Sequence, residues 1–276
     1  MKKILVSMML LTALVCRAQE NARYRITYDC DAQYAPERKN YRWHLDIGTE
    51  QAAFYNPNQR EFDKVKDEIV NGNDVTIVMG KLNDVMTRFP NPIPLQVLVP
   101  ASDGGKYTYL NKDAGEYLCY EEPKPDIDWE MTDRDSTVCG YACLQARARV
   151  YGREWTVWFA PEIPLSYGPY VLGGLPGLIL DAEDSDGLFH FTAVGLQQDP
   201  EGATVSLAGT EKAIRSTRSK YMKLRERANG QSLNDILRGK GFDDKIIKVA
   251  VKVVDAAGKD VDLDASRPKH NFLDVE

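Results

Sequence analysis

Alternation of apolar and polar residues is the dominant pattern of this chain up to about residue 207. A period of two places successive side chains on opposite faces, so it predicts β-strands that bury one face. Segments that we expect to be strands are residues 24–28, 41–47, 52–55, 106–109, 117–121, 138–151, 153–160, 178–182, 188–196 and 203–207, whereas prolines at 90, 92, 94 and 100 interrupt the chain around 95–99. Short turns separate most of them, which favours antiparallel pairing of consecutive strands.

The period changes to three and four residues in two places. Residues 60–70 predict a short helix, because Phe62, Val65 and Ile69 share one stripe. Residues 211–227 predict an amphipathic helix in the C-terminal third, with seven basic and two acidic residues. Its apolar stripe is expected to contain Ile214, Thr217, Tyr221, Leu224 and Ala228. We expect its basic face to be solvated, with anionic lipid or an acidic partner as the alternative.

Two further elements are expected near the C-terminus. Ser232 and Asp235 have the spacing of a capping pair for a short helix reaching Leu237, and residues 246–254 predict a strand. Many antiparallel strands followed by helices define an α+β protein. We expect a mostly antiparallel, curved sheet, similar by analogy to the half-barrel of periplasmic lipoprotein carriers.

The first 18 residues have the three parts of a secretory signal. Lys2 and Lys3 precede an apolar run at 4–15 that is too short to span a bilayer, and small residues predict cleavage after Ala18. Cys16 would be lipidated only if a small residue preceded it, and Val15 stands there. We expect residues 1–18 to be a signal peptide and residues 19–276 to be one exported domain. It would be periplasmic or secreted, with outer-membrane association as a possibility and without a membrane span.

The net charge of the mature chain limits the classes of partner that it can bind. Loss of Lys2, Lys3 and Arg17 with the signal leaves 32 basic against 41 acidic residues, a formal net charge of −9. An acidic chain is a poor partner for phosphate backbones, so we expect no nucleic acid. The sequence also lacks nucleotide-binding glycine patterns, and we expect no cofactor.

Four cysteines stay in the mature chain: Cys30, Cys119, Cys139 and Cys143. An even number in an oxidising compartment predicts disulfides, and four cysteines allow three pairings. If residues 138–151 form one strand, Cys139 and Cys143 lie about 13 Å apart, too far for a bridge. No second ligand pair accompanies these two cysteines, so we expect no metal site.

Arg153 and Glu162 stand among aromatic residues at Tyr141, Trp155 and Trp158. One interpretation is a ligand-binding site, in which the aromatics give flat contact area and Arg153 binds a carboxylate or phosphate. The other is structural, with an Arg153–Glu162 ion pair across the strands and aromatic rings filling the sheet. The structural interpretation is favoured.

Evidence for catalysis is weak, and we assign no catalytic residues. Ser166 lacks the Gly-x-Ser-x-Gly turn that exposes a serine nucleophile. The alternative is a periplasmic hydrolase or thiol enzyme that uses Cys143, His44 or Glu162.

A short apolar loop lies between the strands expected at 153–160 and 178–182. Its residues, which run into the second strand, are Gly174, Leu175, Pro176, Gly177, Leu178 and Ile179. Gly173 and Gly174 permit positive φ and close backbone approach, and Pro176 fixes its own φ. We interpret the loop as a fold element that leads into a buried strand.

Several motifs in this order resemble the GLPGLI family, exported proteins of Gram-negative bacteria. The matching runs are Gly140-Tyr141-x-Cys143-x-x-Ala146, Gly152-Arg153-x-Trp155-x-x-Trp158-Phe159, Glu162-Ile163-Pro164, Gly168-Pro169-Tyr170 and the Gly174–Ile179 hexapeptide. Trp129 and the closing residues 271–276 also fit, although Phe272 stands where the family has proline. The resemblance implies export but supplies no biochemical activity. We therefore expect a non-enzymatic protein that binds an apolar or peptide-like ligand, or an envelope protein of outer-membrane transport.

Overall fold

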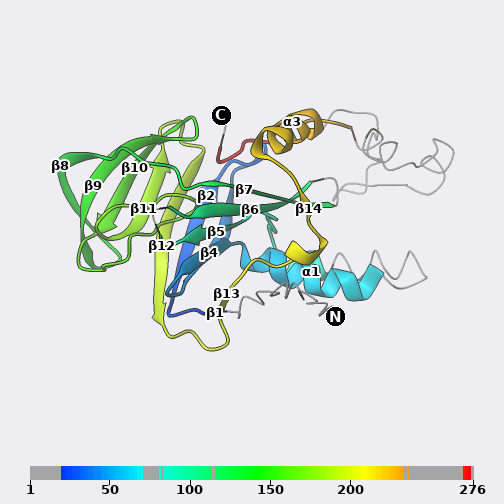
Figure 1. The fold of residues 1–276 in the computed structure, drawn as a ribbon, viewed down its shortest axis with the longest axis horizontal. Coiled ribbons are helices and arrows are strands. Elements are labelled where there is room, and N and C mark those ends of the chain that lie inside the picture. Colours follow the sequence, from blue (N-terminus) through cyan, green and yellow to red (C-terminus); the bar gives the residue numbers. More distant parts are fainter. Residues whose placement is uncertain are drawn as a thin grey trace, which may run out of the picture.

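A computed structural model of the chain contains one twelve-stranded sheet with helices, which confirms the α+β class (Figure 1). It describes residues 20–70, 81, 84–102, 104–113, 116–232, 235 and 270–274. The sheet strands are β2 (Tyr24–Ala32), β3 (Lys39–Ile47), β4 (Gln51–Tyr55), β5 (Gln96–Pro100), β6 (Lys106–Asp113), β7 (Glu116–Pro123), β8 (Glu130–Val138), β9 (Tyr141–Val150), β10 (Arg153–Ala160), β11 (Leu178–Asp184), β12 (Phe189–Gln198) and β14 (Ile214–Arg215). A separate pair joins β1 (Glu20–Asn21) to β13 (Thr204–Val205).

The strands lie in the order β14-β7-β6-β5-β4-β3-β2-β12-β11-β10-β9-β8. Every pairing is antiparallel except that of β14 with β7, which is parallel. Chain-order hairpins make up most of the sheet, as the short turns predict. The pairing of β12 with β2 joins strands β2–β7 to strands β8–β12, and in its register Tyr28 lies opposite Ala193.

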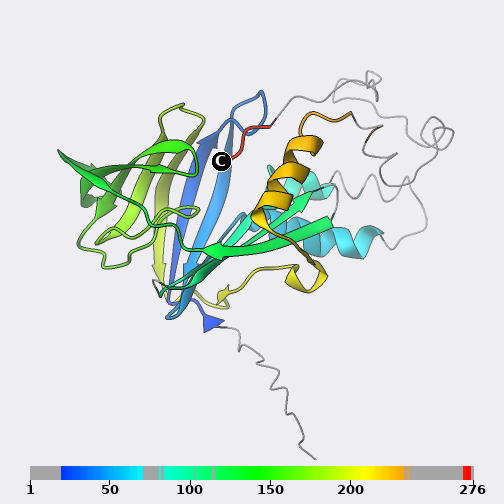
Figure 2. The same cartoon turned by 45° about the horizontal axis from the view of Figure 1, so that its top comes forward.

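Two helices lie on opposite faces of the β4–β7 part of the sheet (Figures 1 and 2). They are α1 (Pro57–Val70) and α3 (Arg218–Ala228), and a short 3-10 turn, η1 (Thr210–Lys212), precedes β14. Asn56 caps α1, because its side-chain oxygen accepts from the Gln59 amide at 2.9 Å. In the part of the chain that the structure describes, no helix is long and apolar enough to cross a bilayer.

The helix expected at 211–227 begins later, at Arg218, where Thr217 caps it by accepting from the Lys220 amide. The predicted apolar stripe is therefore wrong in part. Ile214 lies exposed on β14 and Leu224 is exposed on α3, whereas Tyr221 and Arg225 are buried. Residues four apart on a helix share a face, so α3 presents one aromatic and one charged side chain to the protein interior.

Ser232 and Asp235 form the predicted capping pair. The Asp235 amide donates to Ser232 Oγ at 3.1 Å, and the Ser232 hydroxyl donates to the Asp235 carboxylate at 2.6 Å. The rest of the helix expected to reach Leu237, the strand expected at 246–254, and the signal at 1–18 lie outside the described residues.

Aromatic side chains fill one face of the sheet, which we call the inner face. Trp43 stacks on Phe54 with ring centres 4.7 Å apart, and Phe191 lies between this pair and Trp155. Further along, Tyr109 stacks on Tyr120 at 4.6 Å. The largest fully buried side chains are Trp43, Trp155, Tyr28, Tyr107, Phe54, Phe159, Phe189 and Phe191. Side chains of the sheet's own strands therefore fill its inner face.

The β10–β11 connection, residues 161–177, crosses this inner face. The Tyr107 hydroxyl of β6 donates to the Val171 carbonyl at 3.2 Å, and just beyond the connection the Tyr28 hydroxyl donates to the Ile179 carbonyl of β11 at 2.7 Å. The Trp129 indole N–H donates to the Gly173 carbonyl at 2.9 Å. The connection thereby ties β6 to β11 across the fold.

Within the hexapeptide, Leu175, Leu178 and Ile179 are buried. Gly174 has a positive φ of 87°. Gly177 does not, but a Cβ placed there would lie 2.3 Å from the Ala160 carbonyl oxygen. The need for glycine at 177 is therefore close backbone approach, and these contacts support the fold-element interpretation.

The strand expected at 138–151 is divided. Cys139 and Gly140, with φ of 53° and 84°, form the turn between β8 and β9, so the assumption of one extended strand through Cys139 is wrong. Two residues with positive φ are typical of a tight hairpin turn.

The expected disulfides do not form among the four described cysteines, which are all free thiols. Four strands separate Cys30 on β2 from Cys119 on β7. At about 4.8 Å per strand this is about 24 Å along the sheet, far beyond the reach of a disulfide. The Cys139 thiol instead donates to the Ala193 carbonyl.

Candidate functional site

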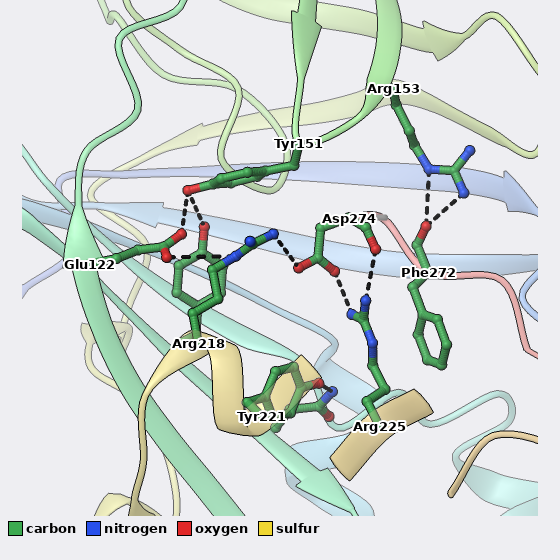
Figure 3. Close-up of polar contacts among 10 residues, drawn as sticks. Glu122, Tyr151, Arg153, Arg218, Tyr221, Arg225, Phe272 and Asp274 are labelled. Atoms are coloured by element: carbon green, nitrogen blue, oxygen red, sulfur yellow. Dashed lines mark hydrogen bonds and ion pairs between the residues drawn. The ribbon is translucent and has the colours of Figure 1, made fainter. Parts of the chain in front are cut away.

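The C-terminal residues 270–274, which we call the tail segment, lie against three arginine side chains (Figure 3). Arg153 begins β10, whereas Arg218 and Arg225 lie on α3. We call these three residues the arginine site. Figure 3 shows their guanidinium groups directed at Phe272 and Asp274 of the tail segment.

The first half of the tail segment is held by hydrogen bonds. The Asn271 amide donates to the Tyr34 carbonyl at 2.7 Å, and its side-chain amide donates to the Gln33 carbonyl at 2.6 Å. The His270 amide donates to Asn229 Oδ1 at 2.7 Å, and Asn229 Nδ2 donates to the His270 carbonyl at 3.2 Å. These bonds fix the register of the segment, which is bound as a short linear peptide would be.

Arg153 holds the middle of the tail segment. Its Nε and Nη2 donate to the Phe272 carbonyl at 3.0 and 2.7 Å, while Nη1 contacts Asp184 Oδ2 at 2.7 Å. Arg153 and Asp184 are only 4% and 2% exposed. Asp184 is itself fixed, because its Oδ1 accepts from the Phe189 amide at 2.7 Å. This buried pair presents two donors in a fixed direction.

The predicted Arg153–Glu162 ion pair is wrong. Glu162 is exposed in the turn after β10, and the carboxylates paired with Arg153 are those of Asp184 and Asp186. The physical reason is the sheet register. Trp155 is opposite Asp184, so Asp184 lies across from the inner-facing start of β10.

Arg225 binds both the ring and the carboxylate of the tail segment. Its guanidinium carbon lies 4.0 Å from the centre of the Phe272 ring. Nη1 donates to Asp274 Oδ1 at 2.5 Å and Nη2 to the Asp274 carbonyl at 2.8 Å. Burial lowers the pKa of Arg225, but the charge and hydrogen bond of Asp274 more than offset this and raise that pKa above its ordinary value.

Arg218 completes the site from the first turn of α3. Its Nη2 lies 3.3 Å from Asp274 Oδ2, and its Nε lies 3.6 Å from Glu122 Oε2. The guanidinium also covers the Tyr151 ring at 4.7 Å. The Tyr151 hydroxyl donates to Glu122 and accepts from the Tyr109 hydroxyl at 3.2 Å. Glu122 and Tyr151 thus position Arg218.

The structure separates the predicted aromatic cluster. Trp155 shares the inner face with Arg153 but packs against Phe191, with ring centres 6.3 Å apart. Tyr141 and Trp158 are half-buried and pack against the core. None of the described contacts of the tail segment involves these three aromatic residues. Of the predicted binding residues, Arg153 is the one that contacts the tail segment.

Geometry gives the thiol-enzyme alternative no support. Four strands separate His44 on β3 from Cys143 on β9. Burial raises the pKa of the Cys143 thiol, and the charges of Glu162 and Asp181 add to that rise. A nucleophilic cysteine needs the opposite environment, one that stabilises the thiolate.

His44 provides a test of the structure by pH. Burial lowers the pKa of His44 to about 4, and the charge of Arg25 adds to this effect. Unfolded histidine titrates near 6.5, so the unfolded chain gains its proton first as the pH falls. The stability that neutral His44 contributes is fully present above pH 6.5. As the pH falls toward 4, the free energy of unfolding decreases by about 3 kcal/mol on account of this residue. In urea titrations at pH 7 and 4, His44→Gln should lose correspondingly less stability than wild type; an equal loss would contradict this placement.

A histidine–carboxylate pair that the sequence did not reveal lies on the β11–β12 hairpin. His190 Nε2 is 2.9 Å from Asp181 Oδ2, and the Thr192 hydroxyl donates to the same oxygen at 2.8 Å. The hydrogen bond to Asp181 raises the pKa of His190 above its ordinary value. The Thr192 hydroxyl donates its proton to Asp181, so the hydrogen bonds of these three side chains are made within the hairpin.

The sequence also missed Arg225, Asp184 and Asp274 as site residues. Arg225 belonged to a helix face expected to be solvated, and Asp184 lies between the strands expected at 178–182 and 188–196. One available signal was the spacing of Tyr221 and Arg225, four residues apart. That spacing placed an arginine on the helix face that packs inward.

No protein-family profile and no curated protein matches the chain. A solved structure of PNGF-II superposes with a TM-score of 0.50 at 12% identity, covering 78% of this chain and 36% of that one. A second crystal form of PNGF-II gives 0.49 at 11%, covering 75% and 33%. A domain described as an outer membrane lipoprotein-sorting protein of Vibrio parahaemolyticus gives 0.28 at 7%, covering 64% and 86%.

At this identity the likeness to PNGF-II concerns the fold alone. The chain spans 36% of the length of that protein, so the activity of the whole does not transfer. The resemblance to GLPGLI proteins stays a prediction from the motifs.

Proposed function

We propose that this chain is an exported, non-enzymatic binding protein, and that its arginine site recognises a short peptide segment. The observation that carries the proposal is the tail segment itself. Its residues Asn271, Phe272 and Asp274 are each held by side chains or backbone from distant parts of the chain. Export follows from the signal-like leader and from the resemblance to exported GLPGLI proteins.

A peptide-like ligand is favoured over an apolar one. A carrier of hydrophobic ligands needs an open apolar cavity. Here Trp43, Phe54, Trp155 and Phe191 pack against one another on the inner face, and residues 161–177 cross it. The polar donors of the arginine site instead point at carbonyl and carboxylate oxygens, which are the groups that a peptide offers.

Binding of a peptide in trans tests the proposal on the full chain. In a tail variant, Phe272→Ala with Asp274→Asn, we expect a labelled heptapeptide with the sequence of residues 270–276 to bind with a Kd in the micromolar range. Fluorescence anisotropy measures this affinity. Arg225→Met added to the tail variant should weaken binding at least tenfold, since the cation that contacts both ring and carboxylate is gone.

The matched control is Arg227→Met in the same background, because Arg227 lies two residues further along α3 and is exposed. It should leave the affinity unchanged. A folded tail variant that binds no peptide, or one that loses equal affinity with both arginine substitutions, contradicts the proposal. Circular dichroism establishes that each variant is folded.

A further inference from the structure

Charge pairing in the arginine site is uneven. Arg153 pairs with Asp184, and Arg218 lies beside Glu122, so both have carboxylates supplied by the body of the fold. The carboxylate that pairs with Arg225 among the described residues is that of Asp274, on the tail segment. Arg225 is only 7% exposed. Without a carboxylate from the occupant, a buried cation would stay uncompensated.

The same guanidinium also fixes what precedes the carboxylate. It lies over the Phe272 ring at 4.0 Å while it binds Asp274 at 2.5 Å. An occupant must therefore place an aromatic ring two residues before an acidic side chain. Arg153 adds two hydrogen bonds to the backbone carbonyl of the aromatic residue. Every residue type has this carbonyl, so these two bonds do not select for sequence. Specificity thus lies with Arg225.

We infer that the ligand class of this site is an acidic peptide of the form aromatic–x–carboxylate, presented by a partner protein. We further infer that the tail segment is a built-in competitor that the ligand displaces. This inference rests on the proposed function, because it requires that the site binds peptides at all. The tail segment supports both inferences, because it occupies the site with an aromatic ring at Phe272 and a carboxylate at Asp274.

The tether makes the competition strong. His270 is hydrogen-bonded to Asn229 at the end of α3, 41 residues earlier in the chain, so the tail segment starts where the helix ends. Because the tail segment belongs to the same chain as the arginine site, its docking is an intramolecular event that does not depend on protein concentration. A peptide in trans therefore meets a site that is already occupied, and wild type should bind it weakly.

Two comparisons test the inference, both by anisotropy with full-length chains. The heptapeptide of residues 270–276 should bind the tail variant at least tenfold more tightly than wild type. In the tail variant, the same peptide with asparagine in place of the aspartate should bind at least tenfold more weakly. Asp133, which is exposed on β8, provides the control, and Asp133→Asn should leave wild-type binding unchanged. If the tail variant is unfolded, Asp274→Asn alone replaces it, with the same expected order of affinities.

The outcomes separate the two proposals. Absence of binding to a folded tail variant overturns the proposed function. Binding that is equal in wild type and tail variant overturns the competitor role, and equal binding of the aspartate and asparagine peptides overturns the carboxylate class. Wild type could also self-associate with increasing concentration. If Asp274→Asn abolishes this self-association, the occupant is a second copy of the chain, and the assignment to a partner protein is wrong.

Discussion

Arg153→Ala is expected to lower the free energy of unfolding by about 3–5 kcal/mol, the range for removing one partner of a buried ion pair. The substitution leaves Asp184, whose side chain is 1% exposed, without its cation. It also removes the two hydrogen bonds to the Phe272 carbonyl. Chemical denaturation of wild type and variant measures the difference.

Glu162→Ala is the matched control, since Glu162 is exposed and does not pair with Arg153. It should change stability by less than about 0.5 kcal/mol. A double-mutant cycle of Arg153→Ala with Asp184→Ala should show coupling, because the two side chains are in contact at 2.7 Å. Equal effects of Arg153→Ala and Glu162→Ala would refute the ion pair described here.

Gly177→Val should destabilise the whole domain by about 3 kcal/mol or more, at the upper end of the overpacking range. A Cβ at this position would lie 2.3 Å from the Ala160 carbonyl oxygen and 2.9 Å from the Pro161 Cα. Backbone atoms cannot yield as a side-chain end can, so the β10–β11 connection would have to move. The melting temperature should fall, with no selective loss of peptide binding while the protein is folded.

Two other glycines calibrate this effect. Gly174→Ala should cost about 1 kcal/mol, because Gly174 has a φ of 87° but open space around it. Gly104 has neither constraint, and Gly104→Ala should be neutral within about 0.5 kcal/mol. If Gly177→Val melts like wild type and has lost binding, the hexapeptide is a functional loop and the structural interpretation is wrong.

The fold was predictable because alternation is a local property. Tyr24–Ala32 and Arg153–Ala160 alternate in sequence and form strands that bury one face. The β8–β9 turn at Cys139 was not predictable from alternation, because its two turn residues continue the pattern of the strands beside them. Local pattern therefore predicts the strands better than the places where they end.

The site was mostly hidden because it joins residues far apart in the chain. Arg153 and Phe272 are 119 residues apart, and Arg225 and Asp274 are 49 apart. Which acid reaches Arg153 depends on strand register, and the nearer acid in sequence, Glu162, proved to be the wrong choice. On the basic helix, the one indication that Arg225 faces inward was its position four residues after Tyr221, an apolar residue of the predicted stripe.

Hydrogen exchange at the Asn271 amide of the intact wild-type chain tests the central claim most directly. That amide donates to the Tyr34 carbonyl at 2.7 Å when the tail segment is docked. It should be protected in the free protein, and millimolar heptapeptide should accelerate its exchange as the tail segment is displaced. Fast exchange without peptide would show that the tail segment is not docked. Protection that added peptide does not change would show that the arginine site is a structural contact and not a binding site.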